Sequence, residues 1–512
     1  MKTKKTIETL AELLHFSVAA CRNAPIAYIR NADSSEETSY QQFENDVKSA
    51  AHSYSGYNLN RRHVALWGPL SYEWMVSFFA IILSGGVAVL LDAGFTVETI
   101  EMLVEQSDTE IIILGYDYGK KLTSYVNSSK VFCIELWDKE KGQSGISAEK
   151  LNFEFSDVLP EQNAVLVFTS GTTGNYKMVP LTHKNLCSNI MSCYYYFGNS
   201  IKSYEIVMPL LPPNHMFGLT AGLLVPIYYG AAIGFGGSLK YVSKSITLFQ
   251  PQYLVVVPAI LDNIFHKIQL QLKNYGQKKL SDGDYIQNIL GRNLKAIISG
   301  GAFLQPEICQ VLQRYKINVC NGYGMTECSP IISCNPIGKG KSGSVGKLIN
   351  PRFAKVRIQN GEIIIRGDTV MKGYYKNEEE NYKIFEKGWL KTGDLGYLDE
   401  DNYLFLTGRK KNLIILADGN NVSPEELENE LENNQLVKTV YVCEEKDRKY
   451  LVANIYPNLE YAQKNKVTDL QEALEKLIYS VNLKFPPYKR IFKFYIHNND
   501  FDKTALGKIR RV

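Results

Sequence analysis

The first half of the chain alternates short, β-branched apolar runs with longer apolar segments of helical period, and this rhythm restricts the fold more than any other feature. Residues 63–68 (HVALWG) are typical of a buried strand, 72–86 (YEWMVSFFAIILSGG) of a helix ending in glycines, and 86–92 (GVAVLLD) of the next strand. Strands separated by helices predict βαβ units and a parallel sheet. Comparable strand-like runs recur at 110–116, 130–136, 163–169, 205–211, 231–237, 253–258 and 294–301. The sequence therefore predicts an α/β protein with stacked α/β layers.

After about residue 340 the pattern changes to strands that follow one another through tight turns. Residues 354–367 contain an Asn-Gly turn, and 396–422 contain Asp-Glu-Asp and Asp-Gly turns, which is hairpin chemistry. A helix is then predicted at 423–432 (SPEELENELE), with Ser423 as N-cap, Pro424 in the first turn and acidic residues near the positive end of the helix dipole.

These patterns predict a division into two domains. Residues 1–407 are expected to form a large N-terminal domain of stacked α/β subdomains plus a β-barrel-like subdomain. The charged segment GRKKN at 408–412 is the expected boundary, and residues 413–512 are expected to form a small, mobile α+β domain. A length of 512 residues suits about three domains or subdomains, at roughly 150 residues each.

Charge and cysteine content exclude several classes of partner. Lys and Arg number 57 against 53 Asp and Glu, and a net charge of +4 is too small to indicate binding to nucleic acid or to a membrane surface. The nine cysteines are odd in number and form no CxxC pair, so neither a disulfide framework nor a zinc site is indicated. A reducing, cytoplasmic location is the simplest expectation.

Membrane insertion is not predicted either. The N-terminus lacks an apolar signal region followed by a small-residue cleavage site. Residues 74–91 and 219–237 approach the ~20 residues needed to span a bilayer. Both are interrupted by glycine, and the second also by Pro226, so each is expected to be a buried helix that passes through a glycine turn into a buried strand. We therefore expect no transmembrane segment.

A short segment after the strand-like run at 163–169 combines hydroxyls, glycines and one ammonium group. Glycine lets backbone N–H groups turn toward a ligand, hydroxyls add donors and lysine adds a mobile positive charge, which together indicate polyphosphate binding. The segment is not a Walker A motif, and an ordinary solvated turn is the alternative interpretation. The residues concerned are Thr169, Ser170, Gly171, Thr172, Thr173, Gly174 and Lys177.

This segment resembles the phosphate loop of the adenylate-forming superfamily, which includes acyl-CoA synthetases, aryl-CoA ligases, luciferases and adenylation domains of nonribosomal peptide synthetases. Further segments resemble the superfamily in its own order, at 36–47, 82–92, 298–304, 321–327, 391–414, 418–428 and 502–511. One departure is visible: Tyr176 and Met178 flank Lys177, where the superfamily usually has glycine after the lysine and often proline before it. Whether these two side chains tune the loop or merely pack is left open.

The resemblance implies a site for ATP and Mg²⁺. The loop residues would wrap the β- and γ-phosphates and later release pyrophosphate. Tyr323 would stack on adenine, Thr326 would contact phosphate and Glu327 would bind Mg²⁺ together with phosphate oxygens and waters. The nucleotide site would also include Gly300, Gly301, Ala302, Asn321, Gly322 and Gly324. Alone, Tyr323 would be an ordinary core tyrosine and Glu327 a surface residue.

Four further positions take their roles from the resemblance. Asp394 would accept hydrogen bonds from the ribose hydroxyls, and Arg409 would contact ribose or phosphate. Lys411 occupies the hinge position at 408–412, about which the small domain would rotate. Lys508 would approach the reacting carboxylate and the α-phosphate, where its charge stabilises the transition state. Without the resemblance, Asp394 would be a structural cap in a turn, Lys411 one charge in a basic linker, and Lys508 part of a solvated basic tail.

Residues 208–226 carry the best indication of the substrate. Peptide-synthetase domains usually have an aspartate here that pairs with an amino group, whereas this chain has His215 followed by Met216, Phe217 and Gly218, as in acyl- and aryl-CoA ligases. Burying an ammonium group without an anionic partner is costly, so an apolar carboxylate is favoured over an amino acid. His215 is expected to gate the pocket or contact the carboxylate, with a structural histidine as the alternative.

The predicted function is ATP-dependent activation of a carboxylic acid, fatty or otherwise apolar, followed by transfer of the acyl group to a thiol. Segments 367–380, 408–428 and 485–491 are closest to fatty acyl-CoA synthetases, in which the turn at Gly419 lets the pantetheine arm of CoA pass. The alternatives are an enzyme that loads the phosphopantetheine of an acyl carrier protein and a non-catalytic nucleotide- or acyl-binding protein. Chain length of the acid and oligomeric state are not predicted.

Overall fold

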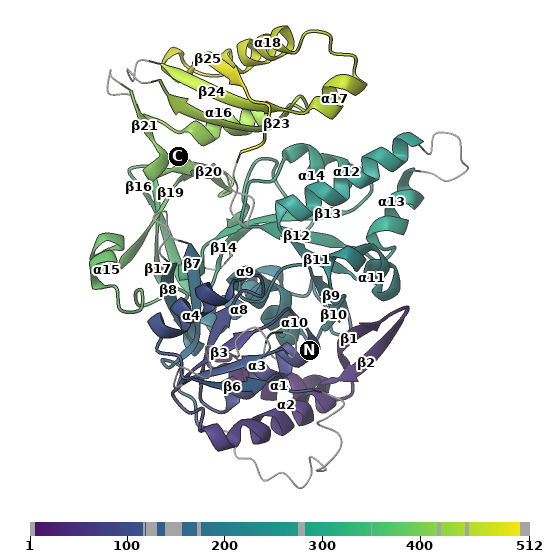
Figure 1. Cartoon of the computed structure of the whole chain (residues 1–512), viewed down its shortest axis with the longest axis vertical. Coiled ribbons are helices and arrows are strands. Elements are labelled where there is room, and N and C mark those ends of the chain that lie inside the picture. Colours follow the sequence, from purple (N-terminus) through teal and green to yellow (C-terminus); the bar gives the residue numbers. More distant parts are fainter. Residues whose placement is uncertain are drawn as a thin grey trace.

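The fold is that of a large body carrying a smaller domain at one end (Figure 1). It is seen in a computed structural model that describes residues 6–115, 118, 131–138, 156–170, 176–274, 282–349, 351–416, 421–445 and 450–501. The described strands form two large sheets and a five-stranded antiparallel sheet in the body, a two-stranded ribbon, and a three-stranded sheet in the smaller domain.

The first sheet has six strands in the order β6-β5-β3-β4-β7-β8. Its first five strands are parallel, and β8 returns antiparallel to β7. β3, β4 and β5 are almost entirely buried, as near-continuous apolar runs in parallel sheets usually are. The elements are β3 (His63–Trp67), α3 (Tyr72–Leu83), β4 (Val87–Leu91), α4 (Val97–Gln106), β5 (Ile111–Leu114), β6 (Phe132–Glu135), β7 (Asn163–Ser170) and β8 (Tyr176–Thr182).

The second sheet has nine strands in the order β15-β14-β13-β12-β11-β9-β10-β1-β2. Strands β1 and β9 to β13 run parallel, while β2, β14 and β15 are antiparallel additions at the two edges. The strands are β1 (Pro25–Asn31), β2 (Ser34–Ser39), β9 (Ile206–Pro209), β10 (Ala232–Phe235), β11 (Tyr253–Val256), β12 (Ala296–Gly300), β13 (Asn318–Gly324), β14 (Ile331–Cys334) and β15 (Lys347–Leu348).

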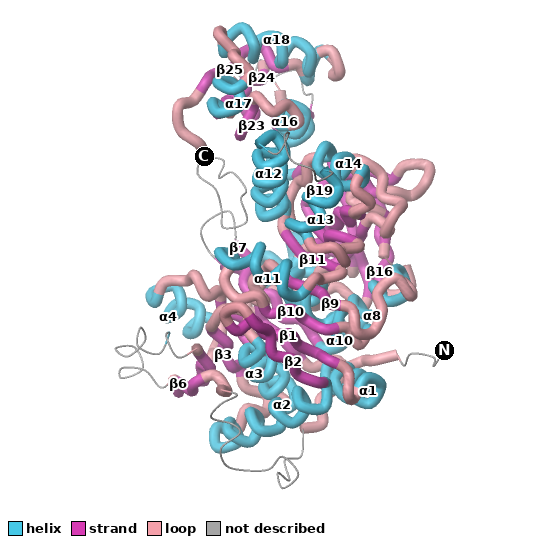
Figure 2. The backbone as a smooth tube through the Cα atoms, turned by 90° about the vertical axis from the view of Figure 1, so that its right-hand side faces the viewer, coloured by secondary structure: helices cyan, strands magenta, loops and turns pink. Residues whose placement is uncertain are grey.

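Helices pack on the two large sheets and between them (Figure 2). One continuous hydrophobic cluster contains residues of both sheets, for example Val64 of β3 and Val207 of β9, so the two sheets share a core. The helices of this part are α1 (Leu10–Cys21), α2 (Tyr40–Tyr54), α8 (His183–Phe197), α9 (Met216–Leu219), α10 (Val225–Tyr229), α11 (Val242–Phe249), α12 (Pro258–Asn274), α13 (Asp282–Leu290) and α14 (Pro306–Arg314).

Both long apolar runs fold as the sequence predicts. The first is α3, a turn at Gly85 and Gly86, and the buried strand β4. The second runs from α9 through one π-helical turn into α10, ends at Gly230 in the left-handed conformation, and continues as β10. Within the described part of the chain, no helix combines the length and apolar character needed to cross a bilayer.

The hairpin region forms the antiparallel sheet. Asn360 and Gly361 both have positive φ, at 51° and 78°, as the Asn-Gly turn between β16 and β17 requires. Asp394 of β19 lies directly opposite Arg409 of β20. The elements are β16 (Ala354–Gln359), β17 (Glu362–Gly367), α15 (Glu378–Ile384), β18 (Phe385–Glu386), β19 (Trp389–Leu398) and β20 (Leu404–Arg409). Strand β20 therefore includes Gly408 and Arg409, and a 3₁₀ turn at Lys410–Asn412 follows it.

The smaller domain has its own hydrophobic cluster. Its elements are β21 (Ile414–Ile415), β22 (Asn421–Val422), α16 (Pro424–Glu432), β23 (Val437–Glu444), β24 (Leu451–Pro457), α17 (Leu459–Lys464), α18 (Leu470–Asn482) and β25 (Ile491–Ile496). In Figure 1 these elements occupy the top of the molecule, from β21 to α18.

Ser423 corrects one prediction. It occupies the N-cap position of α16, but its hydroxyl does not cap the helix. Instead, Ser423 Oγ lies 2.6 Å from the carbonyl oxygen of Thr407 and 2.9 Å from Glu425 Oε2, two acceptors for its single proton. This approach requires glycine at 408, because a Cβ there would lie 1.7 Å from Ser423 Oγ. The hydroxyl therefore ties the smaller domain to β20.

Candidate functional site

The predicted nucleotide residues gather at the carboxyl ends of neighbouring parallel strands. Strands β9, β11, β12 and β13 lie side by side. His215 follows β9, Gly300 ends β12 and is followed by Gly301 and Ala302, and Tyr323 lies near the end of β13. Gly300 of β12 is the direct partner of Gly322 of β13. In open α/β sheets this edge is where ligands bind. The topology thus brings together segments that are far apart in the sequence.

The first sheet faces the same region through Asp92, the residue after β4. Asn214 Nδ2 donates to Asp92 Oδ2 at 3.1 Å, and His215 Nε2 lies 3.9 Å from the same oxygen. Burial lowers the pKa of His215, and the carboxylate of Asp92 opposes that shift. The segment carrying Asn214 and His215 therefore lies against the end of β4, which agrees with the structural alternative for His215. Its roles as a gate or as a contact to the carboxylate stay predictions.

Of the predicted glycines, Gly324 is required by close packing and Gly300 lies in a tight site. A Cβ on Gly324 would lie 2.0 Å from the carbonyl oxygen of Pro330, which no side chain tolerates. A Cβ on Gly300 would lie 3.2 Å from the carbonyl oxygen of Gly322 and 3.5 Å from Cζ of Phe217. The second contact shows that the segment carrying His215 lies against the glycine turn after β12.

Tyr323, Asp394 and Arg409 meet in a hydrogen-bonded group in which Tyr323 and Asp394 are buried and Arg409 is part-exposed. The Tyr323 hydroxyl donates to Asp394 Oδ2 at 2.8 Å, and Arg409 Nε lies 2.9 Å from Asp394 Oδ1. Asp394 is 6% exposed and Tyr323 8% exposed. Burial, reinforced by the Asp394 charge, holds the pKa of Tyr323 well above its usual value. The tyrosine ring is thus more enclosed than the flanking glycines suggested, and its stacking on adenine stays a prediction.

Lys177 is the second residue of β8 and lies directly opposite Thr169, near the end at which β7 and β8 are connected. Its ammonium group pairs with the carboxylate of Glu380 on α15 and lies 5.1 Å from the ring centroid of Tyr374. The Tyr374 hydroxyl in turn donates to Glu327 Oε1 at 2.7 Å. Contacts therefore run from Glu380 through Lys177 and Tyr374 to Glu327. We call these four residues the phosphate-end cluster.

Sequence reasoning missed Tyr374 and Glu380. Both lie in the segment GDTVMKGYYKNEEE, whose acidic run is typical of the solvated first turn of a helix. Asn377 does cap α15, with its side chain accepting from the N–H of Glu380. Glu380 pairs with Lys177, which is 203 residues away, and a contact at that separation produces no periodic pattern in the sequence.

Glu327 is buried and is followed in the same 3₁₀ turn by Cys328, with Thr326 before it. Burial raises its pKa, while the Tyr374 hydroxyl and the positive charges of Arg409 and Lys177 oppose the rise. Among the described residues, no group of three or more His, Cys, Asp or Glu side chains could hold a metal alone. A single carboxylate of this kind suits Mg²⁺, which takes one or two carboxylates plus phosphate oxygens and waters.

Lys411 is close enough to Arg409 and Asp394 for their charges to act on its ammonium group. The residue is exposed, yet partial shielding of its ammonium lowers its pKa, the charge of Arg409 lowers it further, and Asp394 opposes the shift. It lies in the 3₁₀ turn between the body and the smaller domain, and its role as a hinge stays a prediction.

Asn321 is half-buried, and its Nδ2 donates to the carbonyl oxygen of Ser344 at 3.4 Å.

Several predicted residues cannot be placed. The residues outside the described part of the chain are Gly171, Thr172, Thr173, Gly174, Gly419 and Lys508, and for Ser170 only the backbone is described.

Tyr176 and Met178, the two unusual neighbours of Lys177, are both described. Tyr176 packs its ring 5.6 Å from that of Phe95, and both Tyr176 and Met178 contact the hydrophobic cluster on one face of the first sheet. These two side chains therefore pack, and packing explains their apolar character.

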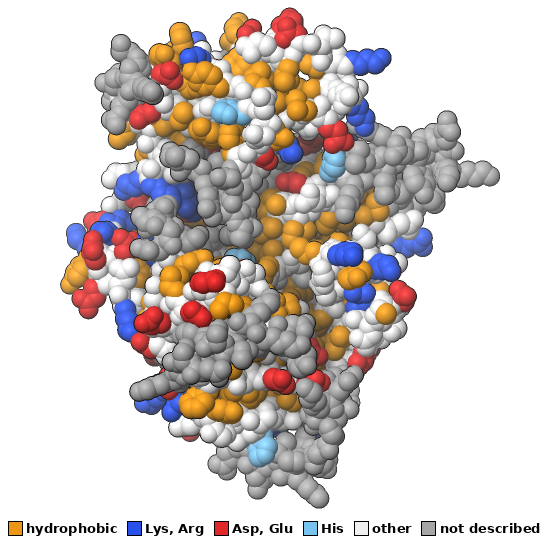
Figure 3. All heavy atoms as spheres, in the orientation of Figure 1, with side chains coloured by type: hydrophobic (Ala, Val, Ile, Leu, Met, Phe, Trp, Pro, Cys, Tyr) orange, Lys and Arg blue, Asp and Glu red, His pale blue; other side chains and the backbone are white. Residues whose placement is uncertain are grey.

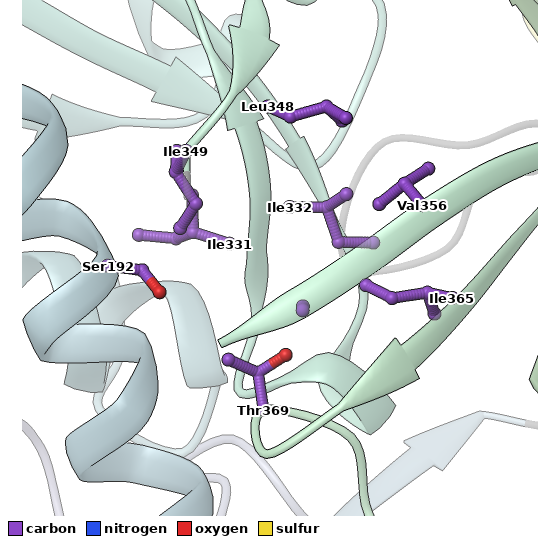
Figure 4. Close-up of a pocket in the computed structure, with 9 residues that line it drawn as sticks. Ser192, Ile331, Ile332, Leu348, Ile349, Val356, Ile365 and Thr369 are labelled. Atoms are coloured by element: carbon purple, nitrogen blue, oxygen red, sulfur yellow. The ribbon is translucent and has the colours of Figure 1, made fainter. Parts of the chain in front are cut away.

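A cavity of about 10 Å³ lies between α8 and the antiparallel sheet (Figure 4). It is lined mainly by apolar side chains, among them Ile331, Ile332 and Ile365, with the hydroxyls of Ser192 and Thr369 at one side. It has room for about one water molecule and is a packing gap, not a substrate site.

Comparison with known proteins agrees with this geometry. The family model for AMP-binding enzymes matches residues 17–375, and that for the AMP-binding enzyme C-terminal domain matches 411–512. A long-chain-fatty-acid–CoA ligase of Mycobacterium bovis is 26% identical over 424 residues, covering 74% of this chain and 70% of its own. An oxalate–CoA ligase of Arabidopsis thaliana is 30% identical over 475 residues, covering 88% and 87%.

Solved structures show the same fold. The o-succinylbenzoate–CoA synthetase of Bacillus subtilis, in complex with its acyl-adenylate intermediate, superposes with a TM-score of 0.78 at 22% identity, covering 98% of this chain and 97% of its own. The chain belongs to the family of AMP-binding enzymes. The predicted α/β fold and the predicted enzyme class, an AMP-forming acid:thiol ligase, are confirmed at that level.

Proposed function

We propose that this enzyme activates an apolar carboxylic acid, fatty or similar, as an acyl-adenylate and then transfers the acyl group to CoA. The observation that carries the proposal is the convergence of charged groups from distant motifs. Lys177 lies beside the Tyr374 ring, whose hydroxyl donates to Glu327. Asp394 pairs with Arg409 and accepts from Tyr323. Such a cluster of opposite charges at the carboxyl edge of a sheet suits a nucleotide triphosphate.

In the first half-reaction, a carboxylate oxygen of the acid attacks the α-phosphorus of ATP and the bond from that phosphorus to the bridging oxygen of pyrophosphate breaks. Lys177 binds the departing phosphates, and Glu327 would hold Mg²⁺ against them. When bound, Mg²⁺ neutralises phosphate charge. In the second half-reaction, a thiolate attacks the acyl carbonyl and AMP leaves. Neither half-reaction requires a nucleophile from the protein, so positioning and charge are the work of the site.

At the other end of the nucleotide, the Asp394 carboxylate would accept hydrogen bonds from the two ribose hydroxyls. Tyr323 and Arg409 already hold this carboxylate through one bond to each oxygen. A carboxylate fixed before the ligand arrives loses little conformational freedom on binding. Adenine would lie between the Tyr323 ring and the turn from Gly300 to Ala302.

The class of acid is inferred from the segment at His215. This segment places Phe217 beside Gly300, and hydrophobic side chains gather across the middle of one face of the molecule, over the region where Figure 1 labels β11, β12 and α9 (Figure 3). The names of the relatives span a fatty acid, oxalate and o-succinylbenzoate, so similarity alone does not select among acids. The apolar segment favours a fatty or other apolar acid.

Pyrophosphate exchange into ATP, measured across a panel of fatty, aryl and amino acids, tests the proposal. We expect exchange with apolar acids and none with amino acids. Absence of exchange with every carboxylate would refute the adenylation reaction and favour the non-catalytic alternative, and a preference for amino acids would refute the substrate class.

The acceptor is tested by adding CoA or a phosphopantetheinylated carrier protein to the acyl-adenylate reaction. We expect the thioester of CoA. By its position in the sequence, Lys508 is proposed to assist only the first half-reaction. Lys508→Ala should therefore lose adenylation far more than thioester formation from supplied acyl-adenylate, and equal losses would refute that role.

A further inference from the structure

The ion pair between Lys177 and Glu380 places an anion where the proposed function needs a phosphate. We propose that Glu380 is a positioning residue that holds Lys177 while the nucleotide site is empty, gives way to the polyphosphate of ATP, and takes Lys177 back as pyrophosphate leaves. The inference rests on the proposed function, because it assumes that Lys177 binds phosphate.

Glu380 is held in place by its own helix and by the chain before it. The side chain of Asn377 accepts from the N–H of Glu380 at 3.2 Å. Asn381, the next residue, accepts from the N–H of Tyr374 at 2.7 Å and donates to its carbonyl oxygen at 3.1 Å. The backbone on both sides of Glu380 is therefore fixed relative to Tyr374, whose ring lies under Lys177.

The same segment is fixed to the hairpin that carries Lys177. The N–H of Tyr375 donates to the carbonyl oxygen of Met178 at 2.9 Å, one residue beyond Lys177. The Tyr375 hydroxyl donates to Asp108 Oδ2 at 2.6 Å, and Lys376 pairs with the same carboxylate. Because both partners are anchored, the Lys177–Glu380 pair is a property of the fold and not a chance meeting of two mobile side chains.

The pair is nevertheless easy to exchange. The side chains of Lys177 and Glu380 are 31% and 26% exposed, so water screens their attraction and a more highly charged phosphate can replace the carboxylate. Glu380 also has a second cation within reach, since Lys383 Nζ lies 3.1 Å from Glu380 Oε1. Displacement therefore does not leave Glu380 without a partner, which lowers the cost of the exchange.

The consequence is that Glu380 should weaken the binding of any ligand that uses Lys177 through its phosphates. Its carboxylate competes for the ammonium group and repels the incoming anion. For pyrophosphate this competition favours release, and for ATP it raises the concentration needed for binding. AMP lacks the phosphates that Lys177 is proposed to bind, so its affinity should not depend on Glu380.

The test is calorimetric titration of the full chain with magnesium pyrophosphate and with AMP. We expect Glu380→Gln to tighten pyrophosphate binding by about 2- to 5-fold, the range of a part-exposed ion pair, and to leave AMP binding unchanged. Glu379→Gln is the matched control, because Glu379 lies on the same helix and pairs with Lys383 at 2.7 Å, not with Lys177. It should change neither affinity.

A double-mutant cycle shows whether Glu380 acts through Lys177. We expect Lys177→Ala to weaken pyrophosphate binding and to abolish the effect of Glu380→Gln, which a general change in surface charge would not do. Unchanged or weaker pyrophosphate binding by Glu380→Gln, or an effect that persists without Lys177, would overturn this inference alone. Failure of Lys177→Ala to weaken pyrophosphate binding, or no binding by the wild-type chain, would overturn the proposed phosphate site together with it.

Discussion

The two ends of the candidate nucleotide site are built in opposite ways. At the proposed ribose end, Asp394 is 6% exposed and is held by Tyr323 and Arg409, its partner across the β19–β20 ladder. At the proposed phosphate end, Lys177 is about a third exposed and is held by a carboxylate that has another lysine beside it. At the proposed ribose end the carboxylate is thus buried although its partner Arg409 is part-exposed, whereas both members of the pair at the proposed phosphate end are part-exposed. This difference is consistent with the proposal that Lys177 exchanges Glu380 for phosphate.

The largest effect is expected from Asp394→Asn. The substitution leaves the part-exposed Arg409 guanidinium and the buried Tyr323 hydroxyl facing a neutral amide. It also removes the charged acceptor proposed for the two ribose hydroxyls, and each hydrogen bond to a charged group contributes about 1.5 to 3 kcal/mol. We expect kcat/KM for ATP in the adenylation assay to fall by on the order of 10² or more. Asp368→Asn is the control, since Asp368 pairs with Lys184 at the surface. A loss below tenfold would contradict the view of a preorganised end.

Lys177→Ala is expected to cost less, roughly tenfold to a hundredfold in kcat/KM for ATP, because its charge is partly exposed. Its unfolding free energy should stay within about 0.5 kcal/mol of the wild-type value, as for most exposed substitutions. Chemical denaturation and the adenylation assay measure the two quantities. A fall in kcat/KM as large as that of Asp394→Asn would remove the contrast between the two ends.

Tyr374→Phe tests the link between Lys177 and Glu327. It keeps the ring under Lys177 and removes the hydroxyl that donates to the buried Glu327 carboxylate at 2.7 Å. Because a buried acceptor loses its donor, we expect the unfolding free energy to fall by about 1 to 3 kcal/mol. Tyr375→Phe is the matched control, since the hydroxyl of Tyr375 binds the exposed Asp108. Equal effects of the two variants would show that the Glu327 contact has no special weight.

The smallest expected effect is that of pH on the Glu380 contact. Hydrogen bonding to Lys177, then to Lys383, lowers the pKa of Glu380. The ion pair is therefore fully present above the ordinary pKa of glutamate and is lost only as the pH falls through the lowered value. The ratio of pyrophosphate affinities between Glu380→Gln and wild type should stay constant from about pH 6 to pH 8.5. A ratio that approaches one by pH 6 would show that another group controls the pair.

The sequence predicted most where burial dictates the residue type. Strand β4 and helix α3 follow directly from an apolar run interrupted by glycines, because both elements are almost wholly buried. Asp394 and Arg409 were found because each sits in a motif that resembles the superfamily. Glu380 and Tyr374 were missed because their partners lie on another subdomain, and only the folded chain brings Lys177 to them.

Ser423 shows the same limit in another form. Its position before a proline and two glutamates predicts an N-cap, and the helix does begin there. Its hydroxyl nevertheless contacts the carbonyl oxygen of Thr407 on β20 and accepts from no backbone N–H of the first turn of α16. Local sequence fixes where this helix starts, whereas tertiary contact decides which acceptor the hydroxyl uses.

Because Ser423 approaches Gly408 so closely, the size of the residue at position 408 affects the contact between the smaller domain and the body. A single methyl group at that position would lie 1.7 Å from Ser423 Oγ and so would act as a wedge. In a chain carrying alanine there, either the Ser423 hydroxyl turns away from Thr407 or the smaller domain moves away from β20. One added carbon atom would thereby break a contact that ties the smaller domain to the body.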